Sequence, residues 1–193
     1  MDMPLDRMTD TPDEALLVLF ANGDASAARS LTARLTPRVI GHAYRLTGNR
    51  AEAEDIAQEA MLRLWKVAPD WRQGEAKVTT WLYRVVANLC TDRLRRARMT
   101  PLEAVPEPED ERPSALEDMQ QRTRVDALQQ ALGRLPERQR QAVVLRHIEG
   151  LTNPEIADIM DVGVEAVESL TARGKRALTA DLKEMKDALG YTQ

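Results

Sequence analysis

Cysteine is almost absent from this chain of 193 residues, since Cys90 is the only one. A single cysteine excludes an intramolecular disulfide and a zinc site built on several cysteines. The sequence contains two histidines, His42 and His147, which we interpret as structural or surface residues. Cys90 lies in an amphipathic segment, which favours a reduced packing residue over a nucleophile. We therefore expect no metal site and no cofactor.

Aromatic residues and long hydrophobic runs are also scarce. Aromatics make up 4% of the chain, although 43% of its residues are hydrophobic. The cores must be built from Leu, Val, Ile, Ala and Met, and no sustained strand-like alternation occurs, so we predict an all-α fold. No apolar run reaches membrane-spanning length, and the N-terminus lacks a charged-then-apolar signal. We therefore expect no membrane insertion and a cytoplasmic protein.

The chain has no excess of positive charge, because its net charge is −4. Residues 1–100 contain 15 Lys and Arg against 13 Asp and Glu, whereas residues 101–193 contain 12 against 18. Phosphate neutralisation supplies most of the non-specific affinity of proteins for DNA. An acidic chain with local basic clusters therefore suggests a factor that reaches DNA weakly alone and is delivered by a larger partner.

A segment rich in proline and acid separates two parts of the chain. Pro101–Pro113 holds four prolines and five acidic residues against one arginine. It lacks the apolar content to pack and cannot form a continuous helix. We predict two small helical domains, residues 1–99 and 114–193, joined by a flexible linker over residues 100–113.

The first domain is predicted to contain four helices. Thr11 is expected to cap the first helix, which continues through Phe20, and the second helix spans about residues 25–47 and ends at Gly48. Asn49 caps the third helix, with Glu52 at the position that completes a capping box. At a spacing of four, this third helix packs three residues inward, namely Ile56, Ala60 and Leu64.

The fourth helix, VTTWLYRVVANLCTDRLRRARM, combines a core face with a cationic end. Its core residues are expected to be Leu82, Val85, Val86 and Leu89. Cations at a helix C-terminus are mildly favourable for the helix itself. However, aromatics and donors are interleaved upstream on the same helix, and this pattern suits stacking and phosphate contacts with single-stranded or melted nucleic acid.

The second domain carries a helix-turn-helix pattern. Thr152 can cap a short helix with Pro154 in its first turn, and the turn is expected at residues 161–163. Val144, Leu145 and Ile148 are expected to share an apolar stripe on a preceding helix that Gly150 ends. The inward stripe of the last two helices is expected to be Ile156, Ala157, Met160, Val164, Val167 and Thr171. Such a helix pair is typical of proteins that lay the second helix in the major groove of DNA.

Three motifs, taken in order, resemble the extracytoplasmic-function (ECF) sigma factors of bacterial RNA polymerase, most closely the sigma-E type. AEDIAQEAMLRLW is similar to the region-two motif of that family, and TTWLYRVVANLCTDRLRR to its promoter-melting helix. LPERQRQAVVLRHIEGLTNPEIADIM followed by AVESL is similar to its region four. The resemblance covers most of the chain and implies that residues 1–99 form region two and residues 114–193 region four.

The resemblance implies three sets of site residues. The third helix would hold the clamp helices of the largest polymerase subunit through Asp55, Gln58 and Glu59. The −10 element, with a base read after flipping from the duplex, would be engaged by Trp81, Arg84, Asn88, Arg93, Arg95 and Arg96. The −35 element would be contacted by Glu168, Ser169, Arg173, Lys175 and Arg176. The implied partners are core RNA polymerase (clamp helices and flap), promoter DNA and an anti-sigma factor of a kind that includes zinc-binding members.

The helix expected to read the −35 element departs from the family pattern. Many members carry a Ser/Thr-rich entry and basic residues there, whereas this chain has Gly163, Glu165 and Glu168. Glutamate can accept a hydrogen bond from cytosine N4, so Glu168 is a candidate base reader. Asp161 replaces the glycine usual in the turn, and aspartate tolerates left-handed geometry better than most residues.

Three further function classes are alternatives to a sigma factor. A two-domain helix-turn-helix transcriptional regulator fits the C-terminal motif nearly as well, but the arginine-rich helix and the missing α/β receiver pattern speak against it. No Gly-rich phosphate loop, convergent His/Asp/Ser set or metal spacing is present, so we do not expect an enzyme. A helical adaptor protein is the remaining alternative.

Overall fold

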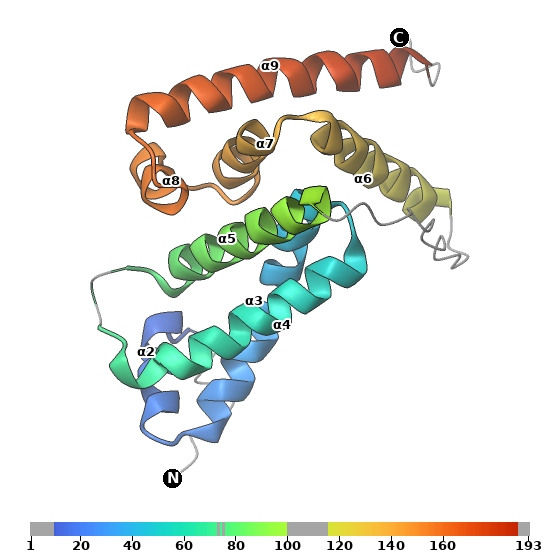
Figure 1. Cartoon of the computed structure of the whole chain (residues 1–193). Helices are drawn as coiled ribbons and strands as arrows, with labels where there is room; N and C mark the ends of the chain where they lie inside the picture. The colour runs from blue at the N-terminus through green and yellow to red at the C-terminus, as the bar shows by residue number, and fades with distance from the viewer. Residues whose placement is uncertain (1–9, 73, 75, 100–115, 189–193) are drawn as a thin grey trace.

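The computed structural model describes residues 10–72, 74, 76–99 and 116–188, and within these it is helical without strands. The predicted all-α fold with two helical domains is confirmed (Figure 1). The predicted linker, residues 100–113, lies outside the described residues. The elements are α2 (Asp13–Ala21), α3 (Ala25–Thr47), α4 (Arg50–Val67), η1 (Ala68–Asp70), α5 (Val78–Met99), α6 (Leu116–Arg134), α7 (Glu137–Val143), η2 (Val144–Ile148), α8 (Asn153–Met160) and α9 (Val164–Ala188).

Capping residues set the helix ends of the first domain. The Asp24 carboxylate accepts the Ser26 N–H at 2.8 Å, so α3 begins there. Gly48 ends α3 with a φ of 76°, a left-handed conformation that glycine adopts without strain. Asn49 Oδ1 caps α4 by accepting the Glu52 N–H at 2.8 Å. The reciprocal bond expected for a capping box is replaced, because the Asn49 N–H donates to Thr47 Oγ1.

The predicted cap of the first helix is wrong. Pro12 occupies the N-cap position of α2, and no side chain caps this helix. The Thr11 carbonyl instead accepts a hydrogen bond from Arg34 Nη1 at 2.7 Å. Helices α3, α4 and α5 then pack around one core, in which Leu31, Ile56 and Leu82 are fully buried.

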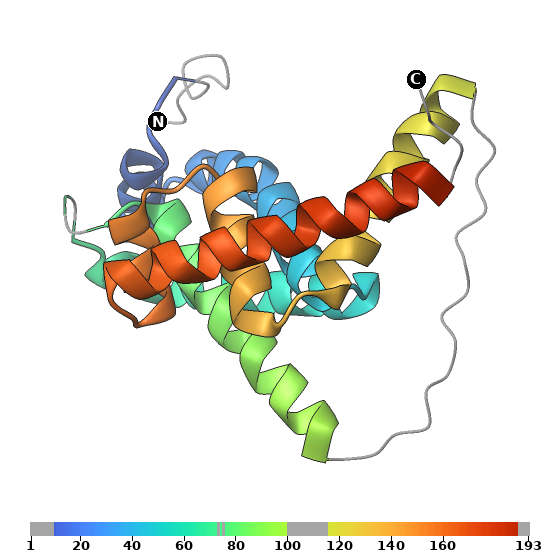
Figure 2. The same cartoon turned by 90° about the horizontal axis from the view of Figure 1, so that it is seen from above.

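The described part of the second domain contains α6, α7, η2, α8 and α9, and α6 was not predicted from the sequence. Seen from above, α9 lies across the other helices of this domain (Figure 2). Its crossing with α7 is close, because a Cβ added at Gly174 would lie 2.6 Å from Val143 Cγ2 and 3.1 Å from the Gln139 carbonyl oxygen. Gly174 is therefore required by packing rather than by its backbone conformation.

Two residues of the predicted apolar stripes face solvent. The helix that follows Pro136 changes to π geometry at Val144–Ile148, where the Glu149 N–H bonds the Val144 carbonyl. The wider turn brings Val144 and Leu145 inside together and leaves Ile148 36% exposed. Val164 is 40% exposed because it lies in the first turn of α9, ahead of the buried Val167.

The two domains pack directly against each other. Helix α5 lies between the rest of the first domain and helices α7 and α8 (Figure 1). Tyr83 and Ala87 of α5 belong to the same buried cluster as Leu145 and Ile156 of the second domain. The chain thus has a second apolar core that both domains build.

Candidate functional site

The outward face of α4 presents the three residues predicted to bind polymerase. Asp55, Gln58 and Glu59 are all exposed, at spacings that place them on one side of the helix. Glu59 Oε1 forms an ion pair with Arg63 Nε at 2.9 Å. Leu62, one turn further along, is 50% exposed and extends this face with apolar surface. Sequence reasoning missed Leu62, because it counted only the polar side chains.

Helix α5 carries the residues predicted to bind the −10 element. Arg84 and Asn88 are exposed one turn apart, and Arg95 and Arg96 are exposed near the end of the helix. Trp81 is partly buried, and its ring meets that of Trp71 edge to face at a centroid distance of 6.1 Å. The structure therefore brings these five residues onto one helix with Trp81 held by the core.

Arg93 differs from the other arginines of α5. It is half-buried, and its Nη1 lies 3.6 Å from Asp55 Oδ2 on α4. Two residues predicted for different partners thus form one ion pair. The arginine side chain is held toward α4 rather than extended into solvent with Arg95 and Arg96.

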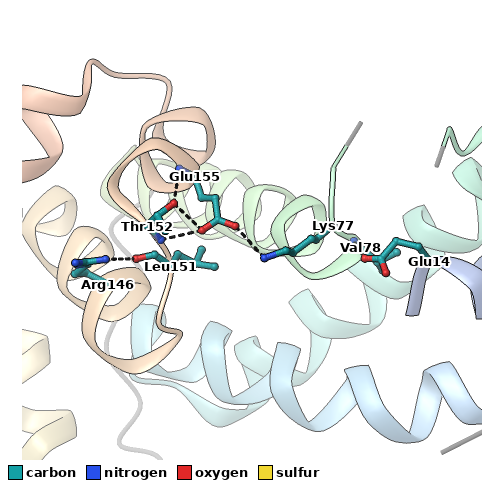
Figure 3. A network of polar contacts seen from close by, with 7 residues as sticks. All are labelled: Glu14, Lys77, Val78, Arg146, Leu151, Thr152 and Glu155. Atoms are coloured by element: carbon teal, nitrogen blue, oxygen red, sulfur yellow. Dashed lines mark hydrogen bonds and ion pairs between the residues drawn. The ribbon is translucent and has the colours of Figure 1, made fainter. Parts of the chain in front are cut away.

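A chain of polar contacts fixes the start of α5 (Figure 3). The Val78 N–H donates to the carboxylate of Glu14 on α2 at 3.0 Å, which satisfies one of the unpaired donors of the helix N-terminus. Lys77, in the preceding loop, forms an ion pair with Glu155 of α8 at 3.3 Å. Hydrogen bonds from Thr152 and the ion pair with Lys77 lower the pKa of Glu155.

The helix-turn-helix forms as predicted at α8 and α9. Thr152 and Glu155 form a complete capping box, and Pro154 lies in the first turn of α8. Asp161 adopts the left-handed conformation with a φ of 52°, so it takes the place that glycine fills in other turns. Val167 is fully buried against α8, which fixes the direction in which α9 presents its exposed side.

All five residues predicted to contact the −35 element are exposed on α9, namely Glu168, Ser169, Arg173, Lys175 and Arg176. Glu168 accepts a hydrogen bond from Asn153 Nδ2 at 3.4 Å, and Arg173 Nε donates to the Ser169 carbonyl at 3.2 Å. The positive charge of this surface also acts on His147, since burial, Lys175 and Arg146 together lower the pKa of that imidazole.

A groove of about 530 Å³ separates the start of α5 from α8. Trp81 and Arg84 line one side, and Asp158 and Asp161 line the other. The positive and aromatic residues predicted for the −10 element therefore face two carboxylates of the helix-turn-helix in this structure.

Each of the two domains matches a known protein family. Residues 31–100 match the family model for sigma-70 region 2, and residues 126–178 match that for sigma-70 region 4. ECF RNA polymerase sigma factor SigM of Mycobacterium tuberculosis is 37% identical over 86% of this chain and 82% of its own length. The chain belongs to the ECF sigma factors of bacterial RNA polymerase.

A further relative supports the family assignment, and a solved structure shares the fold. SigE of Mycolicibacterium smegmatis is 37% identical over 83% of the chain, which spans 65% of that relative. The sigma factor RpoE of Bartonella quintana, solved in complex with the anti-sigma factor NepR, matches with a TM-score of 0.62 at 21% identity, covering 80% of this chain and 96% of its own. Sigma factors do not form a family of catalytic enzymes, and the region 2 match disfavours a conventional helix-turn-helix regulator.

Three further observations concern membrane spans, metal sites and Cys90. No helix in the described part of the chain is long and apolar enough to cross a membrane. No group of three or more His, Cys, Asp or Glu residues with the geometry to hold a metal ion was found among those residues. Cys90 is buried, and burial raises the pKa of its thiol to about 12, so it acts as a packing residue.

Proposed function

We propose that this sigma factor binds the clamp helices of core RNA polymerase through the outward face of α4. Asp55, Gln58 and Glu59 supply acceptors and negative charge, which suit a basic partner helix. Leu62 supplies an exposed apolar contact beside them. Apolar surface within a ring of polar groups is the composition of many protein interfaces.

The −10 element is contacted by α5 in this proposal. Trp81 offers a partly exposed aromatic ring for stacking, and Arg84 and Asn88 lie on the same helix within reach of a base or its phosphate. Arg95 and Arg96 contact backbone phosphates further along. Arg93 contributes less directly, since it is paired with Asp55.

The −35 element is read by α9. Glu168 and Ser169 lie in its second turn, where the recognition helix of a helix-turn-helix contacts base edges. Arg173, Lys175 and Arg176 supply phosphate contacts from the following turns. The acidic character of Glu165 and Glu168 favours contacts with cytosine over contacts with guanine.

Two further parts of the proposal concern partners and location. We propose that a zinc-binding anti-sigma factor inhibits this protein, on the ground of its structural likeness to a sigma factor solved with an anti-sigma factor. We also propose that the chain works in the cytoplasm, where polymerase and promoters are found, and that it has no catalytic activity of its own. The proposed domain limits are residues 1–99 and 114–193.

The observation that carries the proposal is the exposed α4 face around Leu62. A photo-crosslinking amino acid at Leu62 should attach to the largest subunit of core polymerase, because the proposed contact covers it. The same amino acid at Thr179, an exposed position on α9 in the other domain, should give little crosslinking to that subunit. Equal crosslinking from both positions would contradict the assigned surface.

A further inference from the structure

Glu149 contacts three residues of the other domain. Its Oε1 lies 3.2 Å from His42 Nδ1 and 3.5 Å from Arg45 Nη1, both on α3. Its Oε2 accepts a hydrogen bond from Tyr83 Oη, on α5, at 2.6 Å. The His42 side chain is fully buried and that of Glu149 only 11% exposed, so the contact is shielded from solvent.

This contact differs in kind from three other polar contacts between the domains. Gln129 and Arg140 donate to the backbone carbonyls of Tyr44 and Leu46. The Lys77 side chain, which pairs with Glu155, is 70% exposed, and exposed ion pairs contribute little. A buried carboxylate, by contrast, must be compensated by hydrogen bonds and opposite charge, and losing one member leaves the others buried without a partner.

Closure of the domains places α8 across a groove from Trp81 and Arg84, which form part of the proposed −10 surface. Tyr83 and Ala87 on α5 are buried against the second domain. Asp158 and Asp161 line the groove opposite Trp81 and Arg84. A phosphate backbone that approached this part of α5 would meet α8 and two negative charges at short range, which oppose it by excluded volume and by repulsion.

We propose that Glu149 latches an autoinhibited form of the free sigma factor, in which α8 restricts access to the part of the −10-binding surface formed by Trp81 and Arg84. The proposal rests on the proposed function of Trp81 and Arg84. Separation of the domains exposes Glu149, His42 and Tyr83 to water together, so the latch can be opened without stranding a buried charge. Binding of DNA to the −10 surface therefore depends on whether the two domains are closed or separated.

Two variants and one matched control test the latch. Glu149→Gln removes the charge with little change in size, and Tyr83→Phe removes one hydrogen bond and keeps the ring. Glu184→Gln makes the same chemical change at an exposed position on α9. Spin labels at the exposed positions Thr32 and Thr179, in a Cys90→Ala background, report the interdomain distance by pulsed electron spin resonance.

Both latch variants should broaden or lengthen the measured distance and bind a single-stranded −10 oligonucleotide more tightly than the unaltered protein. The expected gain in affinity for Glu149→Gln is about tenfold, which corresponds to loss of a hydrogen bond to a charged group. Glu184→Gln should match the unaltered protein. Unchanged distance and affinity in both latch variants would overturn the proposal.

The same oligonucleotide bound to the complex with core polymerase separates this proposal from the proposed function. In that complex, Glu149→Gln and the unaltered protein should bind equally, whereas Arg84→Ala should bind more weakly. If the latch variants separate the domains but gain no affinity, restricted access is contradicted. If Arg84→Ala has no effect in the complex, the proposed −10 surface is contradicted whatever the latch does.

Discussion

Arg93 on α5 and Asp55 on α4 form an ion pair with 3.6 Å between Nη1 and Oδ2. This contact joins the surface proposed for polymerase to the helix proposed for the −10 element. The Asp55 side chain is 68% exposed, so the pair itself contributes little to stability. The pair holds Asp55 toward α5. Gln58 and Glu59 are then the polar residues of this α4 face that do not pair with α5.

Replacing Gln58 and Glu59 together by alanine should therefore weaken binding to core polymerase. The expected loss is about 1–3 kcal/mol, the range for side chains near the centre of an interface. The affinity is measured with labelled sigma factor and purified core polymerase. Glu184→Ala, which removes an exposed acid from α9 in the other domain, is the control and should bind normally. Equal losses in the two proteins would refute the assigned face.

Arg95→Ala should weaken promoter binding by the polymerase complex to a similar extent for all promoter sequences. If Arg95 contacts a phosphate, the slope of log affinity against log salt concentration falls by about one. Asn88→Ala should instead leave the salt slope unchanged, because its amide carries no charge. A salt slope that Arg95→Ala does not alter would place that arginine away from the DNA backbone.

Gly174→Ala should destabilise the second domain by about 1–3 kcal/mol, because the added methyl group overlaps Val143 and the backbone at Gln139. Gly133→Ala in α6 is the matched control. A Cβ at Gly133 meets nothing within 4 Å, so this change should stabilise the helix by about 0.5–1 kcal/mol. Thermal unfolding measures both, and a neutral Gly174→Ala would show that α7 and α9 lie further apart.

The contribution of Glu149 to stability should depend on pH. Burial acts to raise the pKa of this carboxyl, but hydrogen bonds with His42 and Tyr83 and the charge of Arg45 outweigh it, so the pKa is lowered. The charge of Arg38 acts on Tyr83 in the same cluster. A lowered pKa means that the stabilisation is fully present above the ordinary value of 4.5 and is lost as the pH falls through the lowered value. The difference in unfolding free energy between the unaltered protein and Glu149→Gln should therefore shrink below pH 4.5. A difference that is constant with pH would contradict this linkage.

Local sequence signals predicted the helix ends well. Gly48 and Gly150 adopt left-handed backbone conformations at helix ends, and Asn49 and Thr152 cap helices through their side chains. All four act within a few residues along the chain. The resemblance to the ECF sigma factors, rather than helical periodicity, assigned the site residues on α4, α5 and α9.

Contacts between residues far apart in the sequence could not be predicted in this way. Glu149 lies 107 residues from His42 and 66 from Tyr83, so nothing in its local sequence marks it as a buried contact between domains. His42 was interpreted only as a structural or surface residue. The π turn at Val144–Ile148 also has no local signature, and it moved Ile148 out of the predicted stripe.

Run-off transcription with purified core polymerase on a pool of promoters tests the central claim most directly. The account predicts initiation at a subset of promoters only when this chain and core polymerase are both present. Aligned, those promoters should share two elements, one read by α5 and one by α9. Tight sequence-specific binding to duplex DNA by the chain alone, without polymerase-dependent initiation, would contradict the account.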